Sequence, residues 1–270
     1  MGDTHAGRRS SPSPFEKWFP YRKETGGFEF FAFPHAGAGS TVFNSLRDAL
    51  AADETTLTPA VLRGRGRRVN EEPHQSMDAL LAEFEEMARR DGYAAFQGEY
   101  GLLGHCFGAI VAYEIARLLV RAPCADPRLL VVCSCVPPDA IRDTGMSRLP
   151  TPELLAETAA MGGMPADLLD NPDFLEMLEP PLRGDWTICD RYVHEATSKV
   201  SVPILAVRGS GDPYVRAEDL SGWQDHTSEE LVTADLEAAH LVLAEENSSA
   251  LAREVTAALS AIRSPRSQAR

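Results

Sequence analysis

Short apolar segments alternate with longer amphipathic segments along most of the chain. The apolar segments have the length and composition of buried strands, and they lie at residues 28–33, 57–62, 100–104, 129–134, 202–207 and 230–234. Apolar residues recur at helical spacing in residues 76–90, 107–121 and 246–262. Strands that alternate with helices are typical of a mainly parallel sheet flanked by helices. The pattern therefore predicts an α/β fold.

This alternation is interrupted between about residues 140 and 198. The segments "TPELLAETAAMGG" and "NPDFLEMLEPPLRGDW" have helical patterns and no strand pattern between them. Each begins with a helix-start signal, in which Thr151 or Asn171 caps the helix and a proline takes the first helical position. We predict a helical insertion that forms a lid over one end of the sheet. A helical subdomain without a gating role is the alternative interpretation.

The folded part is predicted to be a single domain at residues 15–263. Residues 1–14 and 264–270 are rich in Ser, Pro, Gly and Arg, so we expect both to be loose tails. The formal charge of −14 argues against nucleic-acid binding, which needs a basic face. No apolar run approaches the roughly 20 residues that span a bilayer, and the start has no apolar signal segment. We expect a cytoplasmic protein with no nucleic-acid or membrane partner.

The five cysteines are odd in number and show no CxxC spacing. This pattern favours free thiols in a reducing compartment over a disulfide framework. Cys133 and Cys135 lie in the apolar segment "LLVVCSC", where partner ligands are missing, so we expect no metal site there.

A candidate nucleophile lies between the predicted strand at 100–104 and the helix that follows it. The turn Gly104-His105-Cys106-Phe107-Gly108 has the spacing of the G-x-S-x-G turn of serine hydrolases, with Cys106 in the serine position. Glycines on either side permit the close backbone approach that such a turn needs. A helix N-terminus favours a thiolate, so we expect Cys106 to be a nucleophile. A small buried cysteine after a strand is the alternative.

The partners of this nucleophile follow in the order acid, then histidine, that G-x-S-x-G enzymes use. Asp212 lies in the turn that ends the predicted strand at 202–207, and His240 lies in the loop after the next strand. As alternatives without a catalytic role, Asp212 is a turn residue before Pro213 and His240 is a partly buried histidine in a loop. Weaker substitutes for the acid are Asp190, Asp219 and Asp235. The other histidines lie in the tail (His5), in a polar loop (His74), in Gly-rich turns (His35, His105) or in predicted helical segments (His194, His226).

An oxyanion site is predicted where "FFAFPHAGAGS" ends its strand in a Gly-rich turn. Acyl transfer through a tetrahedral intermediate needs two hydrogen-bond donors for the developing oxyanion. We assign these donors to the backbone N–H groups of Ala36 and Phe107. A phosphate-binding loop is disfavoured, because the turn lacks both G-x-G-x-x-G and the Walker lysine.

Several motifs together resemble the type II thioesterases of polyketide and nonribosomal peptide assembly lines. These motifs are "FPHAGAGS", "LRGRGRR", "GHCFGAIVAYEIARLL", "MGGMP", "GDPYV" and His240, and they occur in order from about Phe30 to about Leu243. The resemblance implies an α/β-hydrolase fold with a helical lid and a triad of Cys106, Asp212 and His240. It also implies a substrate carried as a thioester on the phosphopantetheine of an acyl or peptidyl carrier protein, with no metal or dissociable cofactor.

The chain departs from the family pattern at several positions. The family has serine where Cys106 stands, often Met where Phe107 stands, and a Gly-Gly-His turn where this chain has Ala238-Ala239-His240; "LRGRGRR" also lacks the proline often found in that turn. A cysteine forms a thioester, which keeps the acyl group activated for transfer. Three functions therefore stay open: hydrolysis, transfer to another carrier protein, amine or hydroxyl, and non-catalytic carrier binding. A generic esterase would leave the carrier-associated motifs unexplained.

Two further segments have alternative interpretations. The basic turn at residues 63–68 is either a docking site for an acidic carrier protein or a solvated turn. Met161, Met164 and Met177 either line an acyl site or pack between lid helices.

Overall fold

A six-stranded parallel sheet forms the centre of the protein. The computed structural model describes residues 12–23, 26–162, 171–195 and 199–263. The strand order is β2-β1-β3-β4-β5-β6, and each neighbouring pair is parallel. The strands are β1 (Phe28–Phe33), β2 (Thr55–Pro59), β3 (Tyr100–His105), β4 (Leu130–Cys133), β5 (Ile204–Gly209) and β6 (Leu231–Leu236). Each overlaps a segment that the apolar pattern predicts, so the α/β prediction is confirmed.

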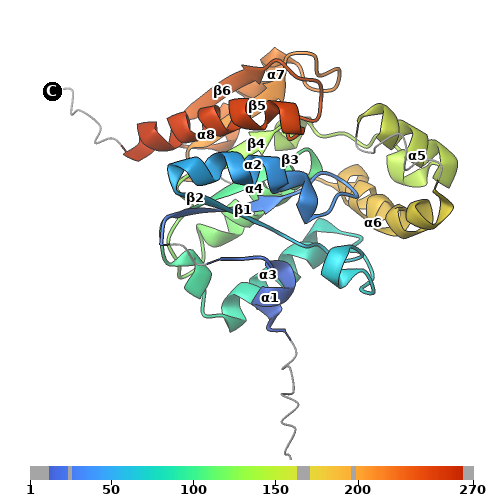
Figure 1. Ribbon diagram of the computed structural model, residues 1–270, viewed down its shortest axis with the longest axis horizontal. Helices are drawn as coiled ribbons and strands as arrows, with labels where there is room; N and C mark the ends of the chain where they lie inside the picture. Colours follow the sequence, from blue (N-terminus) through green and yellow to red (C-terminus); the bar gives the residue numbers. More distant parts are fainter. Residues whose placement is uncertain (1–11, 24–25, 163–170, 196–198, 264–270) are drawn as a thin grey trace, which may run out of the picture.

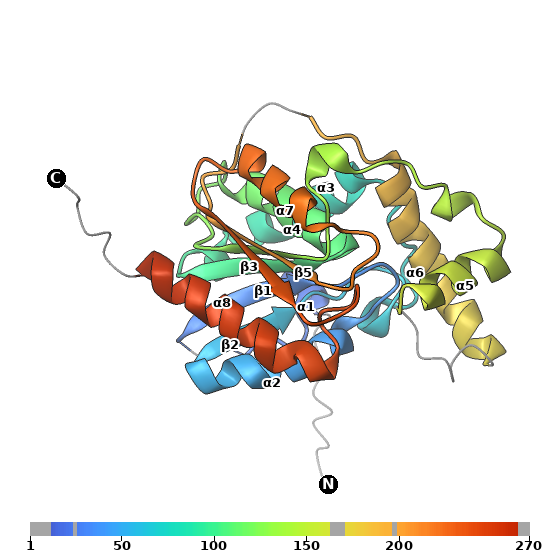
Figure 2. The ribbon, with the colours of Figure 1, turned by 90° about the horizontal axis from the view of Figure 1, so that it is seen from above.

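Helices cover both faces of the sheet (Figures 1 and 2). One face is covered by α2 (Asn44–Leu50) and α8 (Ser248–Arg263), and the other by α1 (Pro14–Trp18), α3 (Met77–Arg90), α4 (Phe107–Leu119) and α7 (Ala217–Ser221). In β1, Phe30 packs towards α2 and α8, while Phe31 and Phe33 pack towards the opposite helices. Strands buried on both faces favour apolar residues at most positions, which explains the apolar segments of the central strands in the sequence.

Short 3-10 helices connect many of these elements. They are η1 (Ser40–Phe43), η2 (Ala51–Asp53), η3 (Gly66–Arg68), η4 (Ala94–Phe96), η5 (Pro138–Ala140), η6 (Met146–Arg148), η8 (Gly222–His226) and η9 (Glu245–Asn247). Helix α1 begins with Ser13 as its capping residue, slightly before the predicted start of the domain. Among the helices in the described ranges, none has the length and apolar character needed to cross a membrane.

The segment between β4 and β5 contains α5 (Thr151–Ala160) and α6 (Pro172–Arg191), which lie beside each other at one end of the sheet (Figures 1 and 2). Asn171 caps α6 as predicted, because its side chain accepts a hydrogen bond from the Phe174 N–H at 3.1 Å. The predicted Thr151 cap is wrong. Pro150 precedes α5, and the Thr151 hydroxyl instead accepts from Arg183 of α6 at 3.1 Å.

Candidate active site

The nucleophile turn joins β3 to α4 through a strained backbone. Cys106 has a φ of 53°, which is uncommon for a residue with a side chain. The flanking glycines are required by close contacts: a Cβ at Gly104 would lie 2.1 Å from the carbonyl oxygen of Gly108, and a Cβ at Gly108 would lie 2.0 Å from the carbonyl oxygen of Phe33. This packing holds the partly exposed Cys106 side chain at the N-terminus of α4.

His240 and Asp212 meet at the same end of the sheet. The Nδ1 atom of His240 lies 2.8 Å from Oδ2 of Asp212. The other carboxylate oxygen accepts from the N–H groups of Tyr214 at 2.8 Å and Val215 at 3.2 Å, which fixes the carboxylate. The side chain of Cys106 lies near enough to His240 to help raise the pKa of its imidazole. The structure therefore brings the three candidate residues into one chain of contacts.

The electrostatic environment of these three residues favours the charged form of His240. Burial opposes the charge on His240, but hydrogen bonds to Asp212 and Cys106 outweigh it and raise the pKa of His240 to about 10. Burial likewise opposes the charge on Asp212, yet the hydrogen bond from His240 and the two backbone N–H groups lower the pKa of this carboxyl. At neutral pH the site holds an imidazolium against a carboxylate.

The two predicted oxyanion donors lie on neighbouring segments. The contacts of Gly108 with the backbone oxygens of Phe33 and Pro34 place the loop after β1 against the start of α4. Within the described ranges, the N–H groups of Ala36 and Phe107 have no hydrogen-bond acceptor. The N–H of Cys106 is not available to an oxyanion, because it donates to the Cys133 carbonyl at 2.8 Å. Two free donors beside the nucleophile are what an oxyanion site requires.

Two further histidines support His240, and sequence reasoning did not assign them this role. His105 is fully buried, and its Nε2 atom donates to the backbone oxygen of His240 at 3.1 Å. Its ring lies 5.4 Å from the ring of His35. Burial lowers the pKa of His35 to about 4 and the pKa of His105 well below its ordinary value, so both rings are neutral at pH 7. In the sequence, the only indication of this role was that His35 and His105 lie in the two Gly-rich turns.

The three weaker candidates for the acid of the triad all interact with residues other than His240. Asp190 accepts from the backbone N–H groups of Thr144 and Ser147, Asp219 pairs with Arg216, and Asp235 pairs with Arg208. None of the three contacts His240.

Two other histidines, His194 and His226, pack together against Tyr113 of α4, with their ring centroids 4.9 Å apart. His226 ends η8, and its Nε2 atom lies 2.8 Å from Oδ1 of Asp139. The prediction that His194 lies in a helical segment is wrong, because α6 ends at Arg191. The chain leaves the helix there, and the Tyr192 hydroxyl donates to Glu114 at 2.6 Å.

Two arginines of the basic turn are buried, so both sequence interpretations are wrong for these two residues. Arg65 and Arg68 are only 6% and 2% exposed. Arg65 pairs with Asp185 of α6, and Arg68 pairs with Glu71 and Glu83. These contacts leave neither guanidinium for docking a carrier protein.

The three methionines of the predicted lid have different surroundings. Met161 is partly buried and packs against the main apolar core. Met177 is 53% exposed and is therefore not packed between lid helices. Met164 lies outside the described residues, as do residues 1–11 and 264–270 of the predicted tails.

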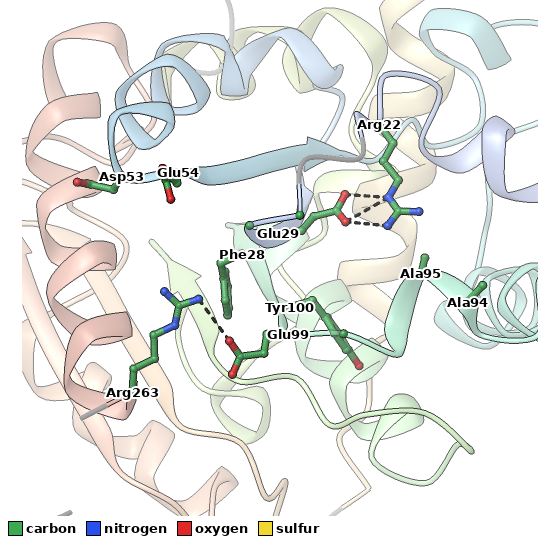
Figure 3. Close-up of a pocket in the computed structure, with 13 residues that line it drawn as sticks. Arg22, Phe28, Glu29, Asp53, Glu54, Ala94, Ala95, Glu99, Tyr100 and Arg263 are labelled. Atoms are coloured by element: carbon green, nitrogen blue, oxygen red, sulfur yellow. Dashed lines mark hydrogen bonds and ion pairs between the residues drawn. The ribbon is translucent and has the colours of Figure 1, made fainter. Parts of the chain in front are cut away.

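A polar cavity of about 570 Å³ lies at the opposite edge of the sheet (Figure 3). It is lined by residues at the starts of strands, including Phe28 of β1 and Tyr100 of β3, and Figure 3 shows the ion pair of Arg22 with Glu29 at its rim. Cys106 follows the other end of β3, so this cavity is separate from the triad. Within the described ranges, no cluster of three or more His, Cys, Asp or Glu side chains is spaced to hold a metal ion.

Comparison with known proteins places this arrangement in a family. The thioesterase domain family matches residues 28–259. The chain belongs to this family. It is 27% identical over 259 residues to linear gramicidin dehydrogenase LgrE of Brevibacillus parabrevis, covering 93% of this chain and 94% of that protein. It is 28% identical over 195 residues to thioesterase PikA5 of Streptomyces venezuelae, covering 72% of this chain and 68% of PikA5. In other curated relatives the chain spans only 16% of a much longer protein.

A solved structure of similar fold is the type II thioesterase BorB from the borrelidin biosynthetic cluster. It has a TM-score of 0.79 and 24% identity, with coverage of 92% of this chain and 99% of BorB. This likeness shows the fold. The α/β-hydrolase architecture expected from the motifs is therefore confirmed.

Proposed function

We propose that this thioesterase-family protein hydrolyses acyl thioesters carried on the phosphopantetheine arm of acyl or peptidyl carrier proteins in polyketide or nonribosomal peptide biosynthesis. The observation that carries the proposal is the contact chain from Cys106 through His240 to Asp212 at a strained strand-to-helix turn. Membership of the thioesterase domain family supports the reaction class. The names of PikA5 and BorB, a thioesterase and a type II thioesterase of a biosynthetic cluster, support the biosynthetic setting.

The proposed first half-reaction transfers the acyl group to Cys106. His240 holds the proton of Cys106, and the thiolate attacks the thioester carbonyl. The carbonyl oxygen becomes an oxyanion, which accepts hydrogen bonds from the N–H groups of Ala36 and Phe107. The tetrahedral intermediate collapses, the bond to the phosphopantetheine sulfur breaks, and His240 returns the proton to that sulfur. The products are an acyl-S-enzyme and a free carrier thiol.

The second half-reaction releases the acyl group. Neutral His240 takes a proton from water, and the resulting hydroxide attacks the acyl carbonyl over the same two N–H donors. Collapse breaks the bond to the Cys106 sulfur and yields the free acid. Asp212 keeps the Nδ1 side of the ring occupied, so that Nε2 faces the reacting atoms in both halves.

Acyl transfer is the second candidate, and the identity of residue 106 favours it. A cysteine acyl-enzyme is itself a thioester, so attack by a second carrier thiol, an amine or a hydroxyl stays feasible. The first half-reaction is the same for both candidates. Non-catalytic carrier binding is disfavoured, since the contact chain around Cys106 would then have no use.

The test measures the fate of a radiolabelled acyl group on a carrier protein. Hydrolysis predicts free labelled acid at a rate that Cys106→Ala abolishes. The matched control is Cys124→Ala, which removes another partly exposed thiol, beyond the C-terminal end of α4, and should leave the rate unchanged. Label that moves to a second carrier protein, with little free acid, would identify a transferase. Equal turnover of wild type and Cys106→Ala would refute the assignment of Cys106.

A further inference from the structure

Asp185, in the middle of α6, contacts the loop that carries one of the proposed oxyanion donors. It is only 4% exposed. Its Oδ2 atom accepts from the backbone N–H of Gly37 at 2.8 Å. The two residues are 148 positions apart in the chain. A helix of the segment between β4 and β5 is therefore tied directly to the loop after β1.

Arg65, which lies in a third segment of the chain, forms an ion pair with Asp185. Its Nη1 and Nη2 atoms donate to Oδ2 and Oδ1 of Asp185 at 2.7 and 2.8 Å, which is a bidentate pair. Nη1 also donates to the backbone oxygen of Ala38 at 3.1 Å. Asp185 and Arg65 thus hold the loop at two neighbouring residues, Gly37 and Ala38.

The Gly37 contact sets the orientation of the peptide next to the proposed donor. In a trans peptide the N–H and the preceding carbonyl point in opposite directions. Holding the Gly37 N–H towards Asp185 therefore turns the Ala36 carbonyl away from α6, and that oxygen lies 3.3 Å from Nδ1 of His35. A flipped peptide would place the Ala36 carbonyl against a buried carboxylate, which is repulsive. The contact therefore keeps the loop in one conformation.

The guanidinium is also needed for electrostatic reasons. An unpaired carboxylate near a developing oxyanion would oppose its negative charge, and the effect is strong at a buried site. Arg65 neutralises that carboxylate while leaving its Oδ2 atom available to the Gly37 N–H. Leu182, one turn before Asp185 on α6, lies against Gly37: a Cβ on this glycine, whose φ is 73°, would be 3.0 Å from its side chain. Helix α6 therefore shapes the loop through both polar and apolar contacts.

We propose that Asp185 and Arg65 are positioning residues that hold the oxyanion loop in its active conformation, so that the loop is competent only while α6 is docked. This inference rests on the proposed function, because it assigns the Ala36 N–H to the oxyanion. Its competitor is a purely structural ion pair that keeps α6 folded onto the core.

The test uses a double variant to separate the two. Arg65→Met with Asp185→Leu replaces the ion pair with apolar groups of similar size, and such replacements of buried pairs are often neutral for stability. We expect a Tm close to that of the wild type. We expect kcat for acyl-carrier hydrolysis to fall by about 10- to 100-fold, less than the loss of an oxyanion donor itself, with a smaller change in KM. A double variant with wild-type Tm and wild-type kcat would overturn the proposal.

The matched control is Asp190→Ala on the same helix. Asp190 is similarly buried and accepts from the backbone N–H groups of Thr144 and Ser147, but it does not contact the oxyanion loop. We expect a lower Tm with little change in kcat. A loss of kcat equal to that of the double variant would mean that any loosening of α6 suffices, and would overturn the specific role of Asp185.

Two readouts distinguish a failure of this inference from a failure of the proposed function. Alkylation of Cys106 by iodoacetamide needs the thiolate but forms no oxyanion, so its rate should be unchanged in the double variant; a parallel fall in alkylation and kcat would indicate general distortion and overturn the proposal. Amide hydrogen exchange in residues 34–39 should be faster in the double variant than in wild type or Asp190→Ala. This second readout decides the loop contact even if wild type shows no hydrolysis, and unchanged exchange would overturn it.

Discussion

Replacing Asp212 with Asn separates the charge of this side chain from its shape. The Oδ1 atom that accepts from the Tyr214 and Val215 N–H groups can be kept. The amide NH₂ then takes the place of the oxygen that faces His240. An amide donates to Nδ1 and so moves the imidazole proton to Nε2, which can no longer accept the proton of Cys106. The variant should fold normally and hold the wrong tautomer.

The size of the effect follows from the pKa of His240. A rise from 6.5 to about 10 corresponds to about 5 kcal/mol in favour of the imidazolium, at about 1.4 kcal/mol for each pH unit. Asp212 supplies much of this, through its hydrogen bond and its charge. Since an opposite charge in contact typically moves a pKa by about 1–3 units, we expect the pKa of His240 to fall by that amount in Asp212→Asn. A histidine in the wrong tautomer typically costs about 10⁴-fold in kcat.

The sign of the pH dependence is also determined. Because the pKa of His240 is raised on folding, its contribution to stability is complete below pH 6.5 and is lost as the pH rises towards 10. Urea unfolding at pH 6, 8 and 10 should show this loss in wild type and a smaller loss in Asp212→Asn. The assay that checks it directly is an NMR titration of ¹³C-labelled histidine. A wild-type His240 that titrates near pH 6.5, or one that titrates near 10 in both proteins, would refute the reasoning.

Three further predictions test other parts of the structure. Gly108→Ala should lower the free energy of unfolding by about 2–4 kcal/mol in urea, because its Cβ would overlap a backbone oxygen, whereas Gly98→Ala, with open space around it, should change it by less than about 0.5 kcal/mol; equal values would contradict the close packing. His35 and His105 have lowered pKa values, so unfolding should become easier as the pH falls from 6.5 towards 4, and a flat unfolding free energy over this range would show that neither ring is held neutral. Iodoacetamide should leave Cys133 unlabelled in the folded protein, because this thiol is fully buried and its pKa is raised to about 12 by burial; peptide mass mapping that finds it labelled early would contradict the sheet assignment.

The strands and the nucleophile turn were predictable because local rules determine them. The central strands are buried on both faces and are therefore mostly apolar, and the resulting segments stand out in the sequence. At the turn, the glycines at 104 and 108 occupy positions where backbone atoms leave no space for a Cβ, so their spacing carries structural information. The chain order of Asp212 and His240 after two strands was enough to place them at one edge of the sheet.

The role of Arg65 could not be predicted, because it depends on a partner far away in the chain. Arg65 and Asp185 are 120 positions apart, and a basic turn in a chain of −14 reads as a surface feature. Thr151 shows the same limit on a smaller scale. Its hydroxyl matches a helix cap locally, but a tertiary contact with Arg183 takes that hydroxyl instead.

Rapid-quench intact-mass analysis of the protein with an acyl-loaded carrier tests the central claim most directly. The account predicts a transient gain of one acyl mass on the wild type that hydroxylamine removes. Peptide mapping should place this mass on Cys106, and the adduct should be absent from Cys106→Ala and present in Cys124→Ala. Release of the acyl group at the wild-type rate by Cys106→Ala, or an adduct on another residue, would contradict it.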